Sequence, residues 1–262
     1  MIYKRIFTGL LAGVMMFGSA FSVQAAPGDS DSGVRASAEA GQGGENSQEL
    51  RGVWISYLDW EKLPADQAGF QKGVDQILGR CVELKMNAVF VHVRSDCDAM
   101  YPSAYFPWSR FVTGTQGKDP GYDPLEYFVE TAHKRGLQFH AWINPYRVTG
   151  NMNRWNQVSD QSFVKQWLSD DDSSNDRFVL RQNGEYYLNP AVEEVQQRII
   201  GGVREVVENY DVDGIHFDDY FYPEVNDSDE GKWFDKPEYD ASGSSLPINQ
   251  WRRENVNKLV RG

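Results

Sequence analysis

The chain has 262 residues, of which 40% are hydrophobic and 13% aromatic, and this apolar content is enough for a sizeable core and excludes disorder over the whole length. Acidic residues outnumber basic ones by 38 to 26, giving a formal net charge of −12 without any run rich in Lys or Arg. Such a charge repels a phosphate backbone, so we expect no nucleic-acid partner.

The N-terminal residues predict export. Lys4 and Arg5 precede an apolar stretch from Ile6 to Phe21, and Val23-Gln24-Ala25 has the small-x-small pattern of a signal-peptidase site. We predict a Sec-type secretory signal over residues 1–25 and a periplasmic or extracellular protein with no membrane anchor after cleavage. Residues 26–48 are almost free of bulky apolar side chains and predict a disordered linker, which leaves residues 49–262 as the folded domain.

Four apolar runs follow, and each one precedes a stretch with helical periodicity. We expect strands over residues 50–57, 88–94, 137–143 and 212–217, with helices over 70–81, 123–136, 189–206 and 248–260. The second and third helices are expected to begin at Asp123-Pro124 and Asn189-Pro190, because each pair places a capping side chain before a proline.

Apolar strands that alternate with helices predict a parallel sheet covered by helices, which is either a doubly wound sheet or a TIM (β/α)8 barrel. No G-x-G-x-x-G or P-loop motif follows a strand, so the barrel is favoured and no cofactor is expected. A full barrel has eight units in about 250 residues. Four units with long loops predict a truncated barrel, with a missing C-terminal half as its partner and two open sheet edges.

Polar residues alternate along three of the strands and predict an inward-facing set. His92 and Arg94 belong to the second strand, and the others follow the same alternation: Gln138, His140, Trp142, Asn144, Gly214, His216 and Asp218. Interior His, Asn or Arg side chains also occur as satisfied core groups, and that interpretation stays open for each of them. Asp218 and Asp219 lie at the C-terminal end of a strand, where barrel enzymes place catalytic groups.

Aromatic residues in the loops predict a sugar-binding groove. The loops after the second and fourth strands contain Tyr101, Tyr105, Phe106, Trp108, Tyr220, Phe221 and Tyr222. Flat aromatic faces stack on the apolar face of a sugar ring. Beside Arg94, Asn144 and the two Asp, they indicate a glycan substrate, although loop packing is the alternative for any single one.

The same segments resemble the family-10-like glycosyl hydrolases of bacterial envelopes. The resemblance spans residues 49–262 and is carried by Glu49–Trp54, Asn87–Arg94, Gly136–Arg147, Leu188–Pro190 and Asp213–Pro223. It implies a TIM barrel, of which this chain is the N-terminal half, together with export and hydrolysis of a glycan. Peptidoglycan glycan strands are the substrate that the resemblance favours.

The order Gly-Ile-His-Phe-Asp at 214–218 is also similar to the fourth strand of amylase-type barrels. On that analogy Asp218 is the nucleophile or electrostatic stabiliser, Asn144 orients substrate, and Arg94 keeps Asp218 ionised. The substrate-binding residues expected beside the catalytic Asp218 and Asp219 are Arg94, His92, His140, Trp142, Asn144, His216, Tyr220 and Tyr222.

A glycosidase needs a second carboxyl group, and Asp219 is a poor partner because neighbouring strand residues diverge. Asp96, Asp98 and Glu224 remain as weak candidates. Barrels of the amylase type take the acid from a fifth strand, so we expect this chain to be inactive by itself.

Two other functions remain open. A glycan-binding module of the envelope needs the aromatic residues but no acid. A metal hydrolase would use His92, His140, His216 and Asp218 as ligands, although the first strand lacks the His-x-His of barrel amidohydrolases and we expect no metal. Cys81 and Cys97 are expected at opposite ends of the barrel and therefore unpaired.

Overall fold

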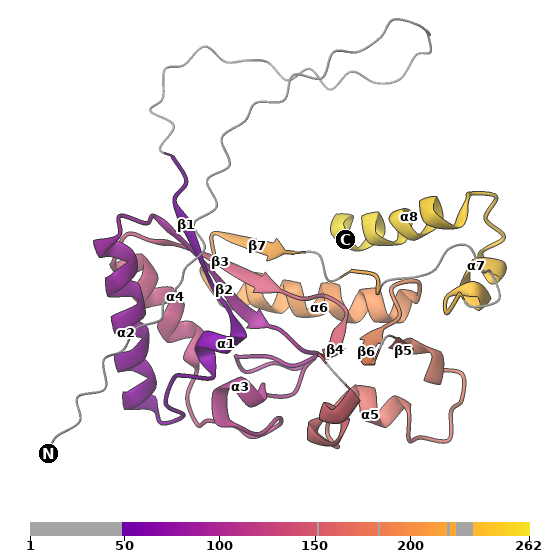
Figure 1. The fold of residues 1–262 in the computed structure, drawn as a ribbon, viewed down its shortest axis with the longest axis horizontal. Coiled ribbons are helices and arrows are strands. Elements are labelled where there is room, and N and C mark those ends of the chain that lie inside the picture. The colour runs from indigo at the N-terminus through magenta and orange to yellow at the C-terminus, as the bar shows by residue number, and fades with distance from the viewer. Residues whose placement is uncertain (1–48, 151, 183, 219–220, 224–232) are drawn as a thin grey trace, which may run out of the picture. The chain divides into compact units, whose positions relative to one another are not determined.

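The computed structural model describes residues 49–262 except 151, 183, 219–220 and 224–232 (Figure 1). The predicted signal and linker lie outside the described residues. Within the part that is described, no helix is long and apolar enough to cross a membrane.

The centre of the fold is a four-stranded parallel sheet. Its strands are β1 (Gly52–Ile55), β2 (Ala88–Arg94), β3 (Gln138–Ile143) and β7 (Gly214–Phe217). They lie side by side in the order β1-β2-β3-β7, and all three pairings are parallel. The four predicted strands are therefore confirmed, with the first and last shorter than expected.

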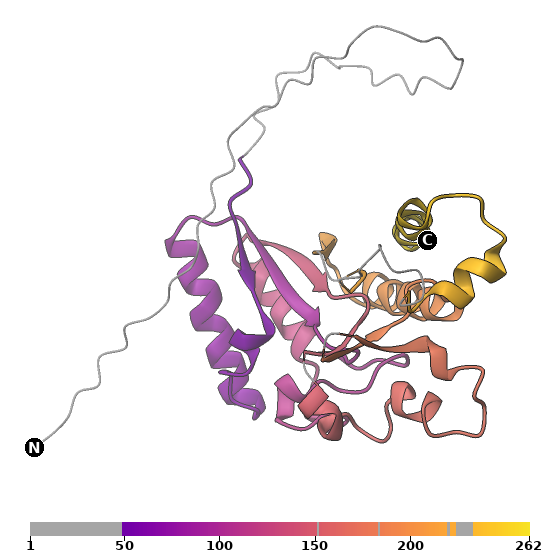
Figure 2. The ribbon, with the colours of Figure 1, turned by 45° about the vertical axis from the view of Figure 1, so that its right-hand side comes forward.

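One long helix follows each of these strands. The helices are α2 (Gln67–Glu83), α4 (Pro124–Lys134), α6 (Glu193–Asn209) and α8 (Ile248–Arg261). Figures 1 and 2 show α2 and α4 packed together on one side of the sheet, with α8 beside α6. Asp123 caps α4 as predicted, since its carboxylate accepts hydrogen bonds from the backbone N–H of Leu125 and Glu126.

The predicted start of the third helix is wrong. The helix α6 begins at Glu193, after the N-cap Val192. Asn189 instead ties two loop segments together, because its side chain donates to the Arg177 carbonyl and accepts from the Ala191 N–H. An Asn-Pro pair therefore marks a turn here and not a helix cap.

The long loops carry additional structure that the sequence did not predict. A second, antiparallel sheet has the order β4-β6-β5 and consists of β4 (Arg147–Thr149), β5 (Val179–Gln182) and β6 (Glu185–Leu188). Short helices complete the loops: α1 (Tyr57–Trp60), α3 (Arg110–Thr113), η1 (Met152–Gln157), α5 (Phe163–Trp167), η2 (Asp176–Phe178) and α7 (Lys236–Ser242).

The four-stranded sheet is strongly curved. Trp54 of β1 donates through Nε1 to His216 Nε2 of β7 over 3.3 Å, although two strands separate these edges. In a flat sheet, strands three spacings apart are about 14 Å from each other and their side chains stand nearly parallel. Contact between the edges thus requires the curvature of a barrel wall, and the described fold is a partial α/β barrel.

The two faces of the sheet have different residues. Val89, Val91, Ala141 and Ile143 face the helices and are almost fully buried. On the other face the Phe90 ring stacks between Trp54, at a centroid distance of 4.9 Å, and His140, at 4.7 Å. This alternation matches the pattern predicted for a barrel strand.

Gly214 leaves room for the His140 ring in this stack. A Cβ at position 214 would lie 2.6 Å from Nδ1 of His140. We expect Gly214→Ala to lower the free energy of unfolding by about 1–3 kcal/mol in urea denaturation, because the ring must leave its place on Phe90.

Gly79→Ala in α2 is the matched control, since the nearest atom to its Cβ would lie 3.6 Å away. It should leave stability unchanged or raise it by about 0.5–1 kcal/mol, as expected for Gly to Ala within a helix. Equal losses in both variants would show that crowding on His140 is not the cause.

Both cysteines are free, as predicted, and both are buried. Cys81 lies near the end of α2, and Cys97 follows β2. Burial raises the pKa of the Cys97 thiol to about 12, so it stays protonated and unreactive in the folded chain.

Candidate active site

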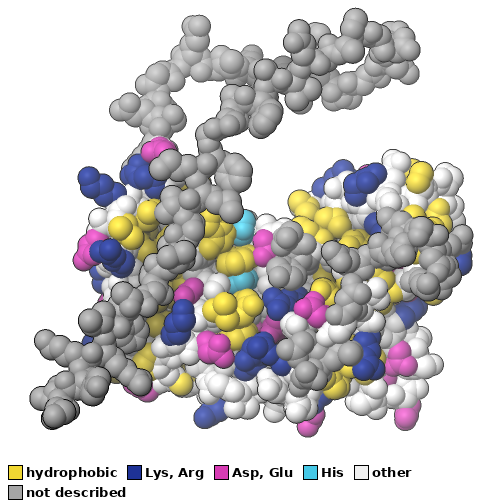
Figure 3. Space-filling model, in the orientation of Figure 1, with side chains coloured by type: hydrophobic (Ala, Val, Ile, Leu, Met, Phe, Trp, Pro, Cys, Tyr) yellow, Lys and Arg dark blue, Asp and Glu magenta, His cyan; other side chains and the backbone are white. Residues whose placement is uncertain are grey.

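Polar and aromatic side chains gather at the C-terminal ends of the parallel strands. Strand pairing places His92 of β2 beside Trp142 of β3, and Trp142 beside His216 of β7. Asp218 follows β7 directly. Figure 3 shows histidine side chains at the surface among hydrophobic ones, over the middle of the sheet.

The Asp218 carboxylate is oriented by an indole group. Nε1 of Trp142 donates a hydrogen bond of 3.0 Å to Oδ2 of Asp218. Asp218 is half-buried. Of the two predicted catalytic residues, Asp218 therefore lies where the prediction put it, whereas Asp219 lies outside the described residues.

His92 is buried and neutral. The backbone N–H of Tyr57 donates to Nδ1 over 3.3 Å, so the proton of the ring sits on Nε2, which lies 3.2 Å from Oδ1 of Asn144. Burial is the main cause that lowers the pKa of His92 to about 3, and the nearby Arg147 charge adds to it. The imidazole therefore carries no charge at neutral pH.

Asn144 links two strands. It is 1% exposed, accepts from His92 through Oδ1 and donates through Nδ2 to the Ser95 carbonyl over 3.1 Å. These bonds hold the ends of β2 and β3 together, which is the role of a satisfied interior amide and not of an exposed substrate contact.

His216 and His140 occupy successive layers of the interior. Nε2 of His216 accepts from Trp54, and burial is the main cause that lowers the His216 pKa, whereas the Asp218 charge acts in the opposite direction. His140 lies one layer deeper, stacked on Phe90, with its Nε2 3.3 Å from Oε1 of Gln138.

The predicted inward orientation of Arg94 is wrong. The register shifts between His92 and Arg94, so that Arg94 pairs with Ile143 and shares the helix-facing side of the sheet. It is 1% exposed, donates through Nη2 to the Pro145 carbonyl over 2.8 Å and lies 4.3 Å from the Phe106 ring centroid. Arg94 therefore supports the backbone after β3.

The loop aromatics divide into buried and exposed groups. Tyr101 and Phe106 are buried, whereas 38% of Tyr105 is exposed. Tyr222 accepts a hydrogen bond from Asn255 of α8 and stacks on Phe234, so it anchors α8. Tyr220 lies outside the described residues.

Arg147 and Asp96 are two site residues that the sequence analysis did not predict together. Nε of Arg147 lies 3.5 Å from Oδ1 of Asp96, and both side chains are at most 10% exposed. The guanidinium also lies 5.6 Å from the Tyr57 ring centroid. Asp96 comes shortly after β2 and Arg147 shortly after β3. This position in the sequence is the signal that could have predicted both residues at the C-terminal end of the barrel.

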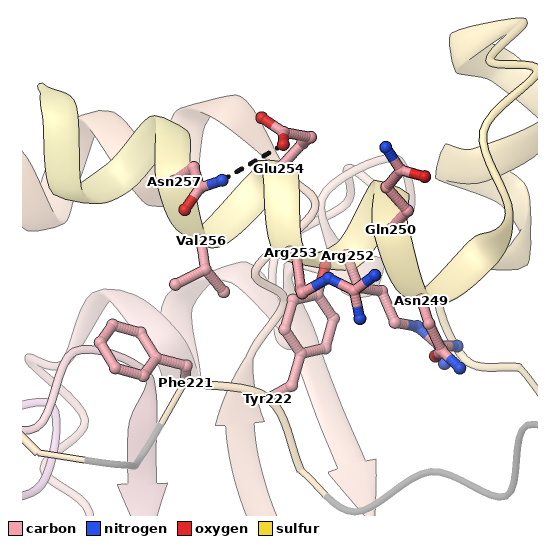
Figure 4. A pocket seen from close by; sticks show the side chains of 9 residues that line it. All are labelled: Phe221, Tyr222, Asn249, Gln250, Arg252, Arg253, Glu254, Val256 and Asn257. Carbon is pink, nitrogen blue, oxygen red and sulfur yellow. Dashed lines mark hydrogen bonds between the residues drawn. The ribbon is translucent and has the colours of Figure 1, made fainter. Parts of the chain in front are cut away.

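A cavity of about 610 Å³ lies between α8 and the segment after β7 (Figure 4). Phe221, Tyr222 and Val256 give it an apolar side, and Arg253 and Asn257 add polar groups. His92, Trp142, His216 and Asp218 do not line it.

A metal centre made of the three histidines does not fit this geometry. Each of them uses a ring nitrogen within the protein, and His92 uses both. Among the described residues, no group of three or more His, Cys, Asp or Glu side chains is arranged to hold a metal ion.

The buried His92 and Asp98 should affect stability with opposite pH dependence. The pKa of His92 falls from 6.5 to about 3 on folding, so protons favour the unfolded state as the pH drops through that window. Burial, reinforced by the Asp96 charge, raises the pKa of Asp98 from 3.8 to about 7, so stability falls as the pH rises through that range.

Urea unfolding at about pH 4 and about pH 6.5 tests this pair of effects. The free energy of unfolding of His92→Phe, relative to that of the original chain, should be higher at the lower pH than at the higher one. For Asp98→Asn the same difference should be higher at the higher pH. Shifts of the same sign in both variants would contradict the assignment.

Comparisons with known proteins identify the family of this chain. Residues 49–262 match the family described as glycosyl hydrolase-like 10. The chain is 39% identical to the glycosyl hydrolase YngK of Bacillus subtilis (strain 168) over 223 residues, which cover 83% of this chain and 42% of that protein. It is 37% identical to the glycosyl hydrolase DigH of Escherichia coli (strain K12), covering 82% of this chain and 51% of that protein.

The chain therefore belongs to the glycosyl hydrolase-like 10 family, and it spans about half the length of these curated relatives. Among solved structures, a maltogenic alpha-amylase from Thermotoga neapolitana is 14% identical with a TM-score of 0.41, covering 73% of this chain and 43% of that one.

Proposed function

We propose that this protein is an exported glycoside hydrolase that acts on a glycan of the bacterial envelope, with peptidoglycan glycan strands as its substrate. The observation that carries the proposal is the Asp218 carboxylate, held by the Trp142 N–H at the C-terminal end of a barrel strand. Membership of a glycosyl hydrolase-like family supports the same class of reaction.

Asp218 acts on the anomeric carbon of the bound sugar. As the bond to the leaving group breaks, positive charge develops on the ring, and a carboxylate beside it either attacks that carbon or stabilises the charge. Trp142 fixes one of the two carboxylate oxygens through its N–H. A second carboxyl group protonates the leaving oxygen.

Trp54 supports a sugar-binding face beside Asp218. It is 53% exposed and contacts His216, two residues before Asp218 in the chain. An exposed indole face stacks on the apolar face of a sugar ring. We expect the 262-residue chain by itself to bind glycan without cleaving it.

Purified glycan strands with and without their peptides test the substrate. The longest product that the gene encodes should release new reducing ends, counted by mass spectrometry of the fragments. Binding without fragments in that protein would favour a non-catalytic glycan-binding module. If the protein neither binds nor cleaves either type of strand, the envelope substrate is contradicted.

A further inference from the structure

Trp142 donates a hydrogen bond to one oxygen of Asp218, and the orientation of the Trp142 ring sets the direction of that bond. An indole N–H is a donor only, and it lies in the ring plane. The Trp142 ring in turn lies against the His92 ring, with a centroid distance of 3.4 Å and an interplanar angle of 16°. The position of the imidazole therefore affects where the indole N–H that Asp218 accepts is held.

The His92 ring is itself fixed at both edges. Tyr57 N–H donates to Nδ1, and Nε2–H donates to Asn144, whose own side chain is bonded to the Ser95 carbonyl. Rotation of the imidazole about its side-chain bonds would break both hydrogen bonds to buried partners, at a cost of about 1–3 kcal/mol for each group left unpaired.

Direct contact between His92 and a substrate does not fit these observations. The residue is 1% exposed, both ring nitrogens are used, and one ring face is covered by Trp142. Burial keeps the His92 pKa near 3, so the ring brings no positive charge to the site.

We propose that His92 is a positioning residue for Asp218, which acts through the stacked Trp142 ring and not through contact with substrate. Its consequence for catalysis rests on the proposed glycosidase function, but the positioning itself is a property of the folded chain.

Exchange of the Trp142 indole N–H with solvent tests the positioning without any assay of activity. In the 262-residue chain with ¹⁵N-labelled tryptophan, the Trp142 signal is assigned by its loss in Trp142→Phe. Asp218→Ala should accelerate exchange because the acceptor is removed. His92→Ala should produce at least half of that acceleration on a logarithmic scale. His92→Phe keeps a flat ring but loses both hydrogen bonds, so its exchange should be slower than in His92→Ala and still faster than in the original chain.

His133→Gln is the control, because His133 lies on α4 and bonds to Asp213, before the start of β7. It should leave exchange of the Trp142 N–H unchanged. If His92→Ala does not fold, the comparison of His92→Phe with His133→Gln decides the matter. Exchange at the original rate in the folded His92 variant would overturn the proposal.

Kinetics distinguish this proposal from the proposed function. In the active form, His92→Phe should lower kcat and leave KM unchanged, since no substrate contact is lost. A raised KM with unchanged kcat would show that His92 binds substrate. Absence of glycan cleavage in the original protein would contradict the proposed function alone, because the exchange measurement would still decide how Asp218 is held.

Discussion

Asp218→Asn should reduce glycan cleavage by at least about 10³-fold, because it removes the negative charge that faces the anomeric carbon. The amide is nearly the same size, and its oxygen can still accept the Trp142 N–H that holds the carboxylate over 3.0 Å. The loss should therefore appear in kcat, with glycan affinity and the free energy of unfolding almost unchanged. Release of reducing ends by the longest gene product measures the effect.

Glu83→Gln is a matched control for the loss of one carboxylate. Glu83 ends α2 and pairs with Arg80 at an exposed position, with both side chains more than 60% exposed. Cleavage at the original rate is expected for this variant. A similar rate in Asp218→Asn would remove Asp218 from the reaction.

Asp235→Ala should destabilise the fold by about 3–5 kcal/mol, because it leaves the buried Arg252 charge without its carboxylate. The pair is bidentate, with Nε to Oδ2 at 2.7 Å and Nη2 to Oδ1 at 2.6 Å, and the two side chains are 6% and 0% exposed. The rings of Tyr222, Trp233 and Phe234 surround the guanidinium. Urea denaturation measures the loss.

The double variant Asp235→Leu with Arg252→Met separates charge from packing. Because both charges are removed and the volume is kept, it should be less destabilised than Asp235→Ala. A double variant that is as unstable as the single one would show that packing of the aromatic groups, and not the loss of the Asp235 carboxylate from Arg252, sets the cost. Glu83→Ala, in the exposed pair with Arg80, should change stability by less than about 0.5 kcal/mol.

The parallel strands and their helices could be predicted because their apolar periodicity is strong. Runs such as 88–94 are buried on both faces and read as strands, and Asp123-Pro124 marks a helix start by its capping chemistry. The same reasoning predicted that four residues lie at one end of the barrel, namely His92, Trp142, His216 and Asp218. The structure brings these four together.

Strict alternation failed where the backbone departs from it. A one-residue register shift after His92 turns Arg94 to the helix side, and no feature of the local sequence distinguishes that shift from a regular strand. In the antiparallel sheet, β5 and β6 form a local hairpin, but β4 pairs with β6 from about 40 residues earlier in the chain. Asn144 was correctly placed in the interior, but only its bonds to His92 and Ser95 reveal a linking role.

The assignment of Asp218 as the group that acts on the anomeric carbon can be measured most directly by restoring its anionic charge from solution. Asp218→Gly removes the carboxylate and leaves space for a small anion, so added azide should restore cleavage of glycan strands and appear in the product as a glycosyl azide. Cleavage by Asp218→Gly at the original rate in the absence of azide would contradict the account.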